Sequence, residues 1–298
     1  MGITDIFGDT FNILRGNPRI LLPYLIYTFL VGGLVLYFVF SGIAGVYGTN
    51  IFMSHRTVPA AQVSGSGALS AMMSFYRAII PLMGLVFLVS LFISPLLIGT
   101  YIGVANQGYR KRRVSLKSAF EVAKKNYLNL LVIEVLVGII WIVALVVLAA
   151  VFLLPLVALG AGLGTGIWFV LGIAVSVVVV ILLAILFYQA YAVAVLEKAG
   201  AVEAIKRSIA IGRQNKGNIF VLFLVSGVIV LAYSILISIL QVILEFGLGA
   251  VGAVLVGAAI AQIVNFTLSS GMAAWFAMVP VGFYKGYVQK PGKRRPKG

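Results

Sequence analysis

The sequence predicts an all-α fold: a polytopic transmembrane helical bundle of six spans, built as three parallel repeats of an interfacial amphipathic helix plus two transmembrane helices. Of the 298 residues, 62% are apolar and only 10% are charged, whereas a soluble domain is about 45–50% apolar and about 25% charged. The mean hydropathy is +1.14. These values exclude a soluble catalytic domain, and we expect a single integral membrane domain over residues 1–298.

Six apolar segments are long enough to cross the hydrocarbon core of a bilayer, which takes about 20 helical residues. They lie at about 20–40, 78–104, 130–153, 167–192, 219–243 and 257–284. Residues 135–196 carry no charge, so we place a tight hairpin at 155–166. Residues 246–284 are also uncharged, and their length favours one span preceded by a glycine-rich re-entrant or interfacial piece near 247–257.

The basic residues are divided unevenly between the two sides of this layout. Of 22 Lys and Arg, 20 fall on one side, and Arg56 and Arg77 fall on the other. By the positive-inside rule the basic side is cytoplasmic. We therefore expect a multi-pass protein of the cytoplasmic (plasma) membrane of a prokaryote with both termini inside. The same division favours topology and anionic lipid over nucleic acid as the explanation of the net charge of +15.

Three segments on the basic side align on a shared asparagine, at Asn17, Asn126 and Asn215. Each places apolar residues on one helical face, and each is followed by two spans. We therefore predict repeat units at about 3–114, 115–200 and 201–288, followed by a basic tail at 289–298.

The same alignment brings Phe11, Phe120 and Ile209 to one position on the apolar faces of the three segments. We expect these side chains to dip into the acyl boundary or to pack on the ends of the spans.

A family resemblance lies in residues 191–198 (YAVAVLEK), which continue into 201–208 (AVEAIKRS) and Asn215. This run resembles the recurring signature of the glycerophosphodiester phosphodiesterase membrane-domain-like proteins, and residues 115–298 carry the resemblance best. The resemblance implies a polytopic membrane module. Some members resemble fusions to a soluble phosphodiesterase barrel, but this chain has no room for a barrel and lacks the acidic and His residues of its metal site. The enzymatic activity is therefore not carried over.

Catalytic and cofactor chemistry finds little support in the sequence. The chain has no Cys and a single His, His55, which excludes the usual Cys and His metal sites. No Ser-His-Asp set, phosphate-binding glycine loop or pair of carboxylates suited to acid–base catalysis is present. We expect no enzyme, no catalytic residue, no cofactor and no metal.

Two groups of polar residues inside the predicted spans are candidates for function, because polar groups in a bilayer are costly. Glu134 is either a proton- or cation-coupled site or a carboxylate that reaches back to Lys124, Lys125 or interfacial water, and we favour the second. The last span holds a denser polar group, comprising Gln262, Asn265, Thr267, Ser269 and Ser270. This group either lines a passage or forms hydrogen bonds between helices, and we favour packing.

Two further patterns support packing and membrane placement. Small residues recur every fourth position up to Asn265, a stripe that lets another helix approach closely: Gly249, Ala253, Gly257 and Ala261. Tyrosines cluster where the returning spans end, the usual place of an aromatic belt: Tyr101, Tyr109, Tyr188, Tyr191, Tyr284 and Tyr287.

Two functions of different class are consistent with these features. The favoured one is a non-enzymatic accessory or scaffold module that contacts anionic lipid headgroups, other membrane proteins or a second copy of itself, and does not bind nucleic acid. The candidate lipid contacts are Arg110, Lys111, Arg112, Arg113, Lys124, Lys125, Arg207, Arg213, Lys293, Arg294 and Arg295. The alternative is a transporter or lipid carrier that uses the polar interior near Glu134 and Asn265.

Overall fold

The computed structural model describes residues 2–47, 65–110, 113–159, 163–249 and 254–289, and the regular structure in these ranges is entirely helical. The elements are α1 (Ile3–Arg15), η1 (Pro18–Leu21), α2 (Leu22–Tyr47), α4 (Gly65–Tyr109), α5 (Leu116–Lys125), α6 (Tyr127–Leu159), α7 (Leu163–Phe187), α8 (Ala190–Leu196), α9 (Ala201–Gln214), α10 (Lys216–Gly249), α11 (Val254–Phe283) and η3 (Tyr284–Val288). The predicted all-α class is confirmed.

Within the described ranges, six helical stretches are long and apolar enough to cross a membrane, as the sequence predicted. They are Pro18–Val35, Ile80–Tyr109, Tyr127–Phe152, Gly166–Leu196, Lys216–Leu244 and Ile260–Val288. Each predicted span overlaps one of these stretches. The chain is therefore a membrane protein with six candidate spans.

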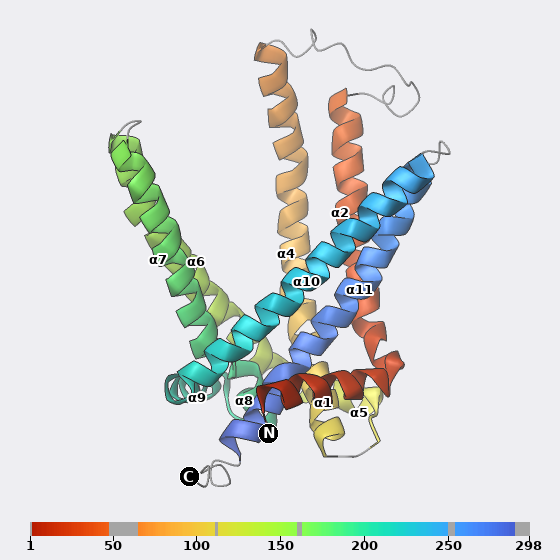
Figure 1. Cartoon of the computed structure of the whole chain (residues 1–298), viewed down its shortest axis with the longest axis vertical. Helices are drawn as coiled ribbons and strands as arrows, with labels where there is room; N and C mark the ends of the chain where they lie inside the picture. Colours follow the sequence, from red (N-terminus) through yellow and green to blue (C-terminus); the bar gives the residue numbers. More distant parts are fainter. Residues whose placement is uncertain (1, 48–64, 111–112, 160–162, 250–253, 290–298) are drawn as a thin grey trace.

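The spans converge at one end of the molecule and spread apart toward the other (Figure 1). The short helices α1, α5, α8 and α9 gather where the spans converge, and η3 lies there too. We call this the basic end, because the exposed Lys and Arg side chains of α5 and α9 lie on it. From it α2, α6 and α10 lead away, and α4, α7 and α11 return.

The buried core lies at the basic end rather than along the whole length of the spans. Tyr101, Ile133 and Phe283 are fully buried there. Farther along α6 and α10, Leu145 is 52% exposed and Leu236 is 62% exposed. Lipid tails are as apolar as leucine side chains, so a bilayer accommodates such side chains without a protein neighbour.

Close contacts join α2, α4 and α11 above the basic end. A Cβ on Gly32 of α2 would come within 2.3 Å of the Phe266 ring of α11, so any larger residue at this crossing requires the ring to move. The Tyr24 and Tyr101 rings stack with their centroids 4.6 Å apart. The Tyr101 hydroxyl donates to the Ile20 carbonyl oxygen at 2.6 Å. These contacts fasten the first span to the second and to the last.

The two uncharged stretches, residues 135–196 and 246–284, compare differently with their predicted structures. The tight hairpin predicted at 155–166 is confirmed, because α6 ends at Leu159 and α7 begins at Leu163. The described parts of the re-entrant or interfacial piece predicted near 247–257 belong to the long helices instead: residues 247–249 end α10 and residues 254–257 begin α11, while 250–253 lie outside the described residues. No proline interrupts this stretch, and an apolar helix keeps its backbone hydrogen bonds internal inside a bilayer. Both helices therefore extend toward each other.

Candidate functional site

Three amphipathic helices, α1, α5 and α9, lie at the basic end (Figure 1), and their ranges agree with the predicted segments. At one shared position of the predicted alignment, each helix buries a small residue: Thr10, Ala119 and Ser208 are all fully buried. Larger side chains, such as Ile6 and Phe7 of α1, are buried beside this position. Each helix therefore meets the spans partly through a small side chain.

The neighbouring position, which we expected to dip into the acyl boundary or to pack on the ends of the spans, is less buried. Phe11 is 51% exposed and Phe120 is 44% exposed, whereas Ile209 is half-buried. Phe11 meets the edge of the Trp275 ring of α11, with centroids 6.4 Å apart. This contact lies on a span, as one of the two alternatives predicted.

The distances at these contacts show how little space separates the helices. A Cβ on Gly103 of α4 would lie 3.1 Å from the Cα atom of Ala119 in α5. In α9, a Cβ on Gly212 would lie 2.8 Å from the carbonyl oxygen of Ile185 in α7. In α11, a Cβ on Gly282 would lie 2.7 Å from the Ile6 side chain of α1. Each amphipathic helix therefore rests on the end of a returning span.

The three aligned asparagines form the same hydrogen bond. The side-chain amides of Asn17, Asn126 and Asn215 donate to the carbonyl oxygen four residues earlier, at 3.2, 2.8 and 3.1 Å. These carbonyls belong to the last turn of a helix, where backbone acceptors lack intrahelical partners. Each asparagine thus closes an amphipathic helix just before the chain enters a span.

Helix α1 is fastened to α11 by Trp275. The indole Nε1 donates to the Phe7 carbonyl oxygen at 3.3 Å, and the Phe7 and Trp275 rings meet edge to face at 5.5 Å. Thr10 and Tyr109 share a hydrogen bond of 2.8 Å that joins α1 to the end of α4. The early segment of the chain is therefore held by its second and last spans.

The predicted lipid-contact residues are exposed wherever the structure describes them. Arg110, Arg113, Lys124, Lys125, Arg207 and Arg213 are all exposed side chains. Five others lie outside the described residues: Lys111, Arg112, Lys293, Arg294 and Arg295. Within the described ranges one ion pair is present, between Arg207 Nε and Glu197 at 3.1 Å. Apart from Arg207, none of the described lipid-contact candidates forms an ion pair within these ranges.

Glu134 forms no ion pair with Lys124 or Lys125 in the described ranges, so the expectation that it reaches back to these lysines is wrong. Its carboxylate accepts hydrogen bonds from the Tyr191 hydroxyl of α8 and from Ser94 Oγ of α4, the latter at 3.4 Å. The side chain lies about two turns into α6 and is held between neighbouring elements that offer hydroxyl donors. A carboxylate with donors inside the protein has no need to extend toward water.

Two members of the tyrosine cluster lie in the core rather than at a lipid surface. Tyr101 is fully buried and Tyr284 is 4% exposed, whereas the other four are half-buried. The hydroxyl of Tyr284 donates to Glu197, the same carboxylate that pairs with Arg207. Both buried hydroxyls therefore have partners in the core, which a belt at the lipid surface does not require.

The polar residues of the last span meet different neighbours. Ser269 Oγ lies 2.9 Å from the Tyr233 hydroxyl of α10 and donates to Asn265 Oδ1 at 3.1 Å. Ser270 Oγ donates to the Phe266 carbonyl oxygen at 2.7 Å and lies 3.4 Å from that of Tyr24 in α2. Thr267 donates within its own helix at 2.8 Å. Gln262 is half-buried.

These hydrogen bonds share no residue with those of Glu134, so the two polar groups do not form one connected network among the described contacts. The small-residue stripe is also divided. Gly249 is the last residue of α10, Ala253 lies outside the described residues, and Gly257 and Ala261 are buried on α11. The sequence spacing of four residues does not reveal that the stripe is shared between two helices, α10 and α11.

Sequence reasoning missed the break between α7 and α8. Helix α7 ends at Phe187 and α8 begins at Ala190, inside the predicted span 167–192. Ser208 Oγ accepts from the Gln189 backbone N–H at 3.1 Å and donates to the Leu186 carbonyl oxygen at 2.7 Å. A serine on α9 therefore satisfies both backbone groups at the break, and no local pattern in residues 186–190 indicates it.

Two polar side chains near this break lack partners. Gln189 is fully buried, and neither polar atom of its amide has a hydrogen-bond partner among the described residues. The Oδ1 atom of Asn106 also lacks a hydrogen-bond partner among the described residues, although the Asn106 backbone carbonyl accepts from Lys285 Nζ at 3.1 Å. Searched over its described ranges, the chain brings together no group of three or more His, Cys, Asp or Glu side chains that could hold a metal.

These features define a class: a polytopic α-helical membrane protein whose spans are gathered at one end by amphipathic helices. The chain belongs to a family of unknown function, DUF7847, whose family model matches residues 1–287. No match was found among the curated proteins or among the solved structures. The resemblance to the glycerophosphodiester phosphodiesterase membrane-domain-like proteins stays a prediction, because the family match does not link the two.

Proposed function

We propose that the chain is a non-enzymatic integral membrane module that acts as an accessory or scaffold and holds anionic lipid at its basic end. In this proposal the basic end is cytoplasmic, both termini are inside, and the three units of amphipathic helix and two spans are parallel repeats. The shared asparagine hydrogen bonds and the three buried small residues support the repeats.

One observation carries the lipid-binding part of the proposal. The described bases of α5 and α9 are exposed, and Arg207, paired with Glu197, is the only base in an ion pair within the described ranges. Each Lys or Arg held near an anionic membrane surface contributes roughly 1 kcal/mol. Bases that form no ion pair with a protein carboxylate keep that energy available for lipid phosphates.

The test measures lipid preference in vesicles. The full chain is reconstituted with spin-labelled phosphatidylglycerol or phosphatidylcholine, and the fraction of motionally restricted label is measured for each. We expect the wild type to prefer phosphatidylglycerol, the preference to fall in Lys124→Gln/Lys125→Gln, and salt to weaken it, because the Debye length is about 10 Å at 0.1 M.

The control variant is Arg77→Gln. Arg77 is exposed and lies in the first third of α4, whose last residue, Tyr109, is at the basic end, so its removal should leave the preference unchanged. Equal association of both lipids with the wild type would refute the proposal.

The second candidate, a transporter or lipid carrier using the region of Glu134 and Asn265, draws support from Glu134 alone. This carboxylate is held between α4, α6 and α8 by Tyr191 and Ser94. Proton flux into vesicles under an imposed membrane potential tests the idea, with a pH-sensitive dye inside. The scaffold proposal expects no flux above that of empty vesicles, whereas a flux abolished by Glu134→Gln would favour the transporter.

A further inference from the structure

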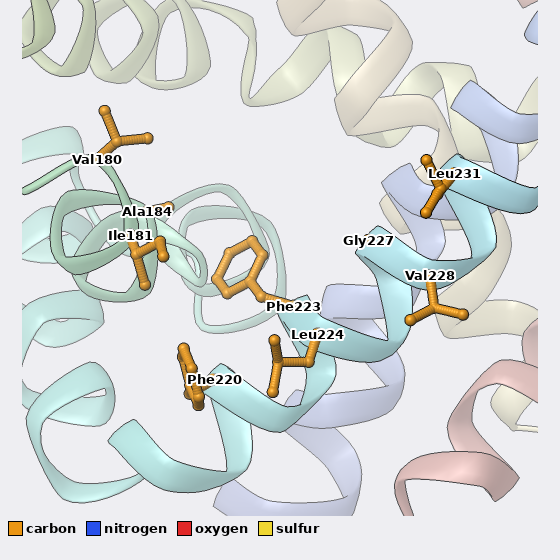
Figure 2. A pocket seen from close by; sticks show the side chains of 9 residues that line it. All are labelled: Val180, Ile181, Ala184, Phe220, Phe223, Leu224, Gly227, Val228 and Leu231. Carbon is orange, nitrogen blue, oxygen red and sulfur yellow. The ribbon is translucent and has the colours of Figure 1, made fainter. Parts of the chain in front are cut away.

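An apolar groove runs between α7 and α10 near the basic end (Figure 2). Its volume is about 480 Å³, within the range of about 300–1,000 Å³ that is usual for ligand sites. Ile181 and Ala184 contribute from α7, and Phe220, Phe223 and Gly227 from α10. No polar side chain lines it. A solute that needs hydrogen bonds therefore finds no partner in this groove.

The groove exists because two helices that touch at their base diverge farther along (Figure 1). At the base, the Tyr188 and Phe223 rings pack edge to face with centroids 5.1 Å apart. Beyond it, Val228 is 66% exposed and Leu231 is 62% exposed, so the groove opens sideways. Gly227 adds width, because no atom lies within 4 Å of where its Cβ would be.

Hydrocarbon is the chemistry that suits such walls. In a bilayer the sideways opening faces acyl chains, and apolar walls without neighbouring atoms lose their dispersion contacts outright. An acyl chain in the groove restores those contacts. It gains little hydrophobic energy in the exchange, since it leaves an equally apolar environment. Selectivity must therefore come from the polar end of the lipid.

The base of the groove carries positive charge. Lys216 precedes Phe220 by one helical turn, which places both on one side of α10. On the other side, Gly212 lies against Ile185, the residue that follows Ala184, and Arg213 comes next in the chain. Both Arg213 and Lys216 are exposed, and neither takes part in the ion pair of the described ranges.

We infer that a membrane phospholipid with an anionic headgroup occupies this site, with one acyl chain in the groove and its phosphate between Arg213 and Lys216. The inference rests on the proposed function and assigns the binding of anionic lipid to one site, the groove between α7 and α10. The charges select the headgroup, and the groove holds the chain without selecting its composition.

The experiment counts lipids bound to the full chain by native mass spectrometry. Phosphatidylglycerol and phosphatidylcholine with identical acyl chains are added in turn to the protein in detergent. Gly227→Leu fills the groove and leaves the charges intact. Its control, Gly138→Leu, adds the same side chain to α6 where no atom lies within 4 Å of the new Cβ. Arg213→Gln/Lys216→Gln removes the charges and leaves the groove intact.

We expect the wild type and Gly138→Leu to retain one phosphatidylglycerol that Gly227→Leu loses. The charge variant should bind phosphatidylglycerol about 30-fold more weakly, since each base near an anionic surface is worth ~1 kcal/mol. Phosphatidylglycerol carrying a photoactivatable group on its acyl chain should label peptides of 180–184 and 220–231 in the wild type. This labelling does not depend on any variant folding correctly.

Three results would overturn the inference. Normal phosphatidylglycerol binding by Gly227→Leu, with labelling elsewhere, would remove the groove site while leaving the proposed function standing. No preference for phosphatidylglycerol by the wild type would refute both. A dimer in the wild type that Gly227→Leu converts to a monomer would show that a second copy of the chain fills the groove.

Discussion

Replacing Gly212 with alanine tests how closely α9 rests on α7. The new Cβ would lie 2.8 Å from the Ile185 carbonyl oxygen and 3.1 Å from the Leu186 Cα atom. Both are backbone atoms, so no flexible side chain can move aside. Reaching the 3.4 Å at which contacts become ordinary requires a shift of 0.6 Å between the helices.

The cost can be estimated from the contacts that the shift disturbs. Overpacking a close interface costs about 1–3 kcal/mol, and the two Ser208 hydrogen bonds at the same interface would lengthen. Alanine in a helix offsets this by about 0.5–1 kcal/mol relative to glycine. We therefore expect Gly212→Ala to lower the free energy of unfolding by about 1–2 kcal/mol.

The assay is unfolding in detergent micelles by titration with sodium dodecyl sulfate, followed by circular dichroism. Gly138→Ala is the matched control, because it makes the same change on α6 with no atom within 4 Å. It should match the wild type or exceed it slightly. A Gly212→Ala variant as stable as the control would show that α9 does not approach α7 this closely, and the packing argument would fail.

Three further predictions follow from the topology and the packing. The chain has no Cys, so single cysteines can be introduced and labelled one at a time. The cysteines of Gly8→Cys and Gly292→Cys should resist an impermeant thiol reagent on intact cells, whereas that of Ala60→Cys should react. Labelling at either of the first two positions would contradict the proposed orientation. Asn265→Leu should lower the free energy of unfolding by at most about 1 kcal/mol, because it removes the acceptor of Ser269 Oγ within the same helix. A loss of measurable flux at normal expression would instead indicate a passage. Phe120→Asp should reduce the yield of folded protein in size-exclusion chromatography relative to Phe120→Leu, because a charge at the acyl boundary is costly; equal yields would show that this side chain faces water.

Hydropathy located the spans well but not their full lengths. The second span was predicted at 78–104, whereas α4 runs from Gly65 to Tyr109. A membrane needs about 20 apolar residues, and a hydropathy pattern reports only that part of a helix. The apolar segment says nothing of where helix continues beyond it, so the extension of α10 to Gly249 was missed for the same reason.

The contacts of the candidate site were harder to predict because they join distant parts of the chain. The period of Phe11 and Phe120 correctly indicated amphipathic helices, but these two rings are exposed and their small neighbours Thr10 and Ala119 are among the buried residues. Glu134 was assigned to nearby lysines because they are close in sequence, whereas its donor Tyr191 is 57 residues away. Local patterns identify helices, and which side chains meet across them depends on packing that a single sequence does not display.

The packing of α1 against α11 has a consequence for how the protein folds during its synthesis. Ile6 meets the position of Gly282, and a ribosome adding about 5–20 residues per second needs roughly 15–55 s to synthesise the segment between them. During that interval Ile6 and Phe7 cannot pack against α11, although both are buried in the finished molecule. An interrupted chain therefore differs from a complete one at its N-terminal helix, whose apolar face stays open to chaperones and membrane proteases until the last span arrives.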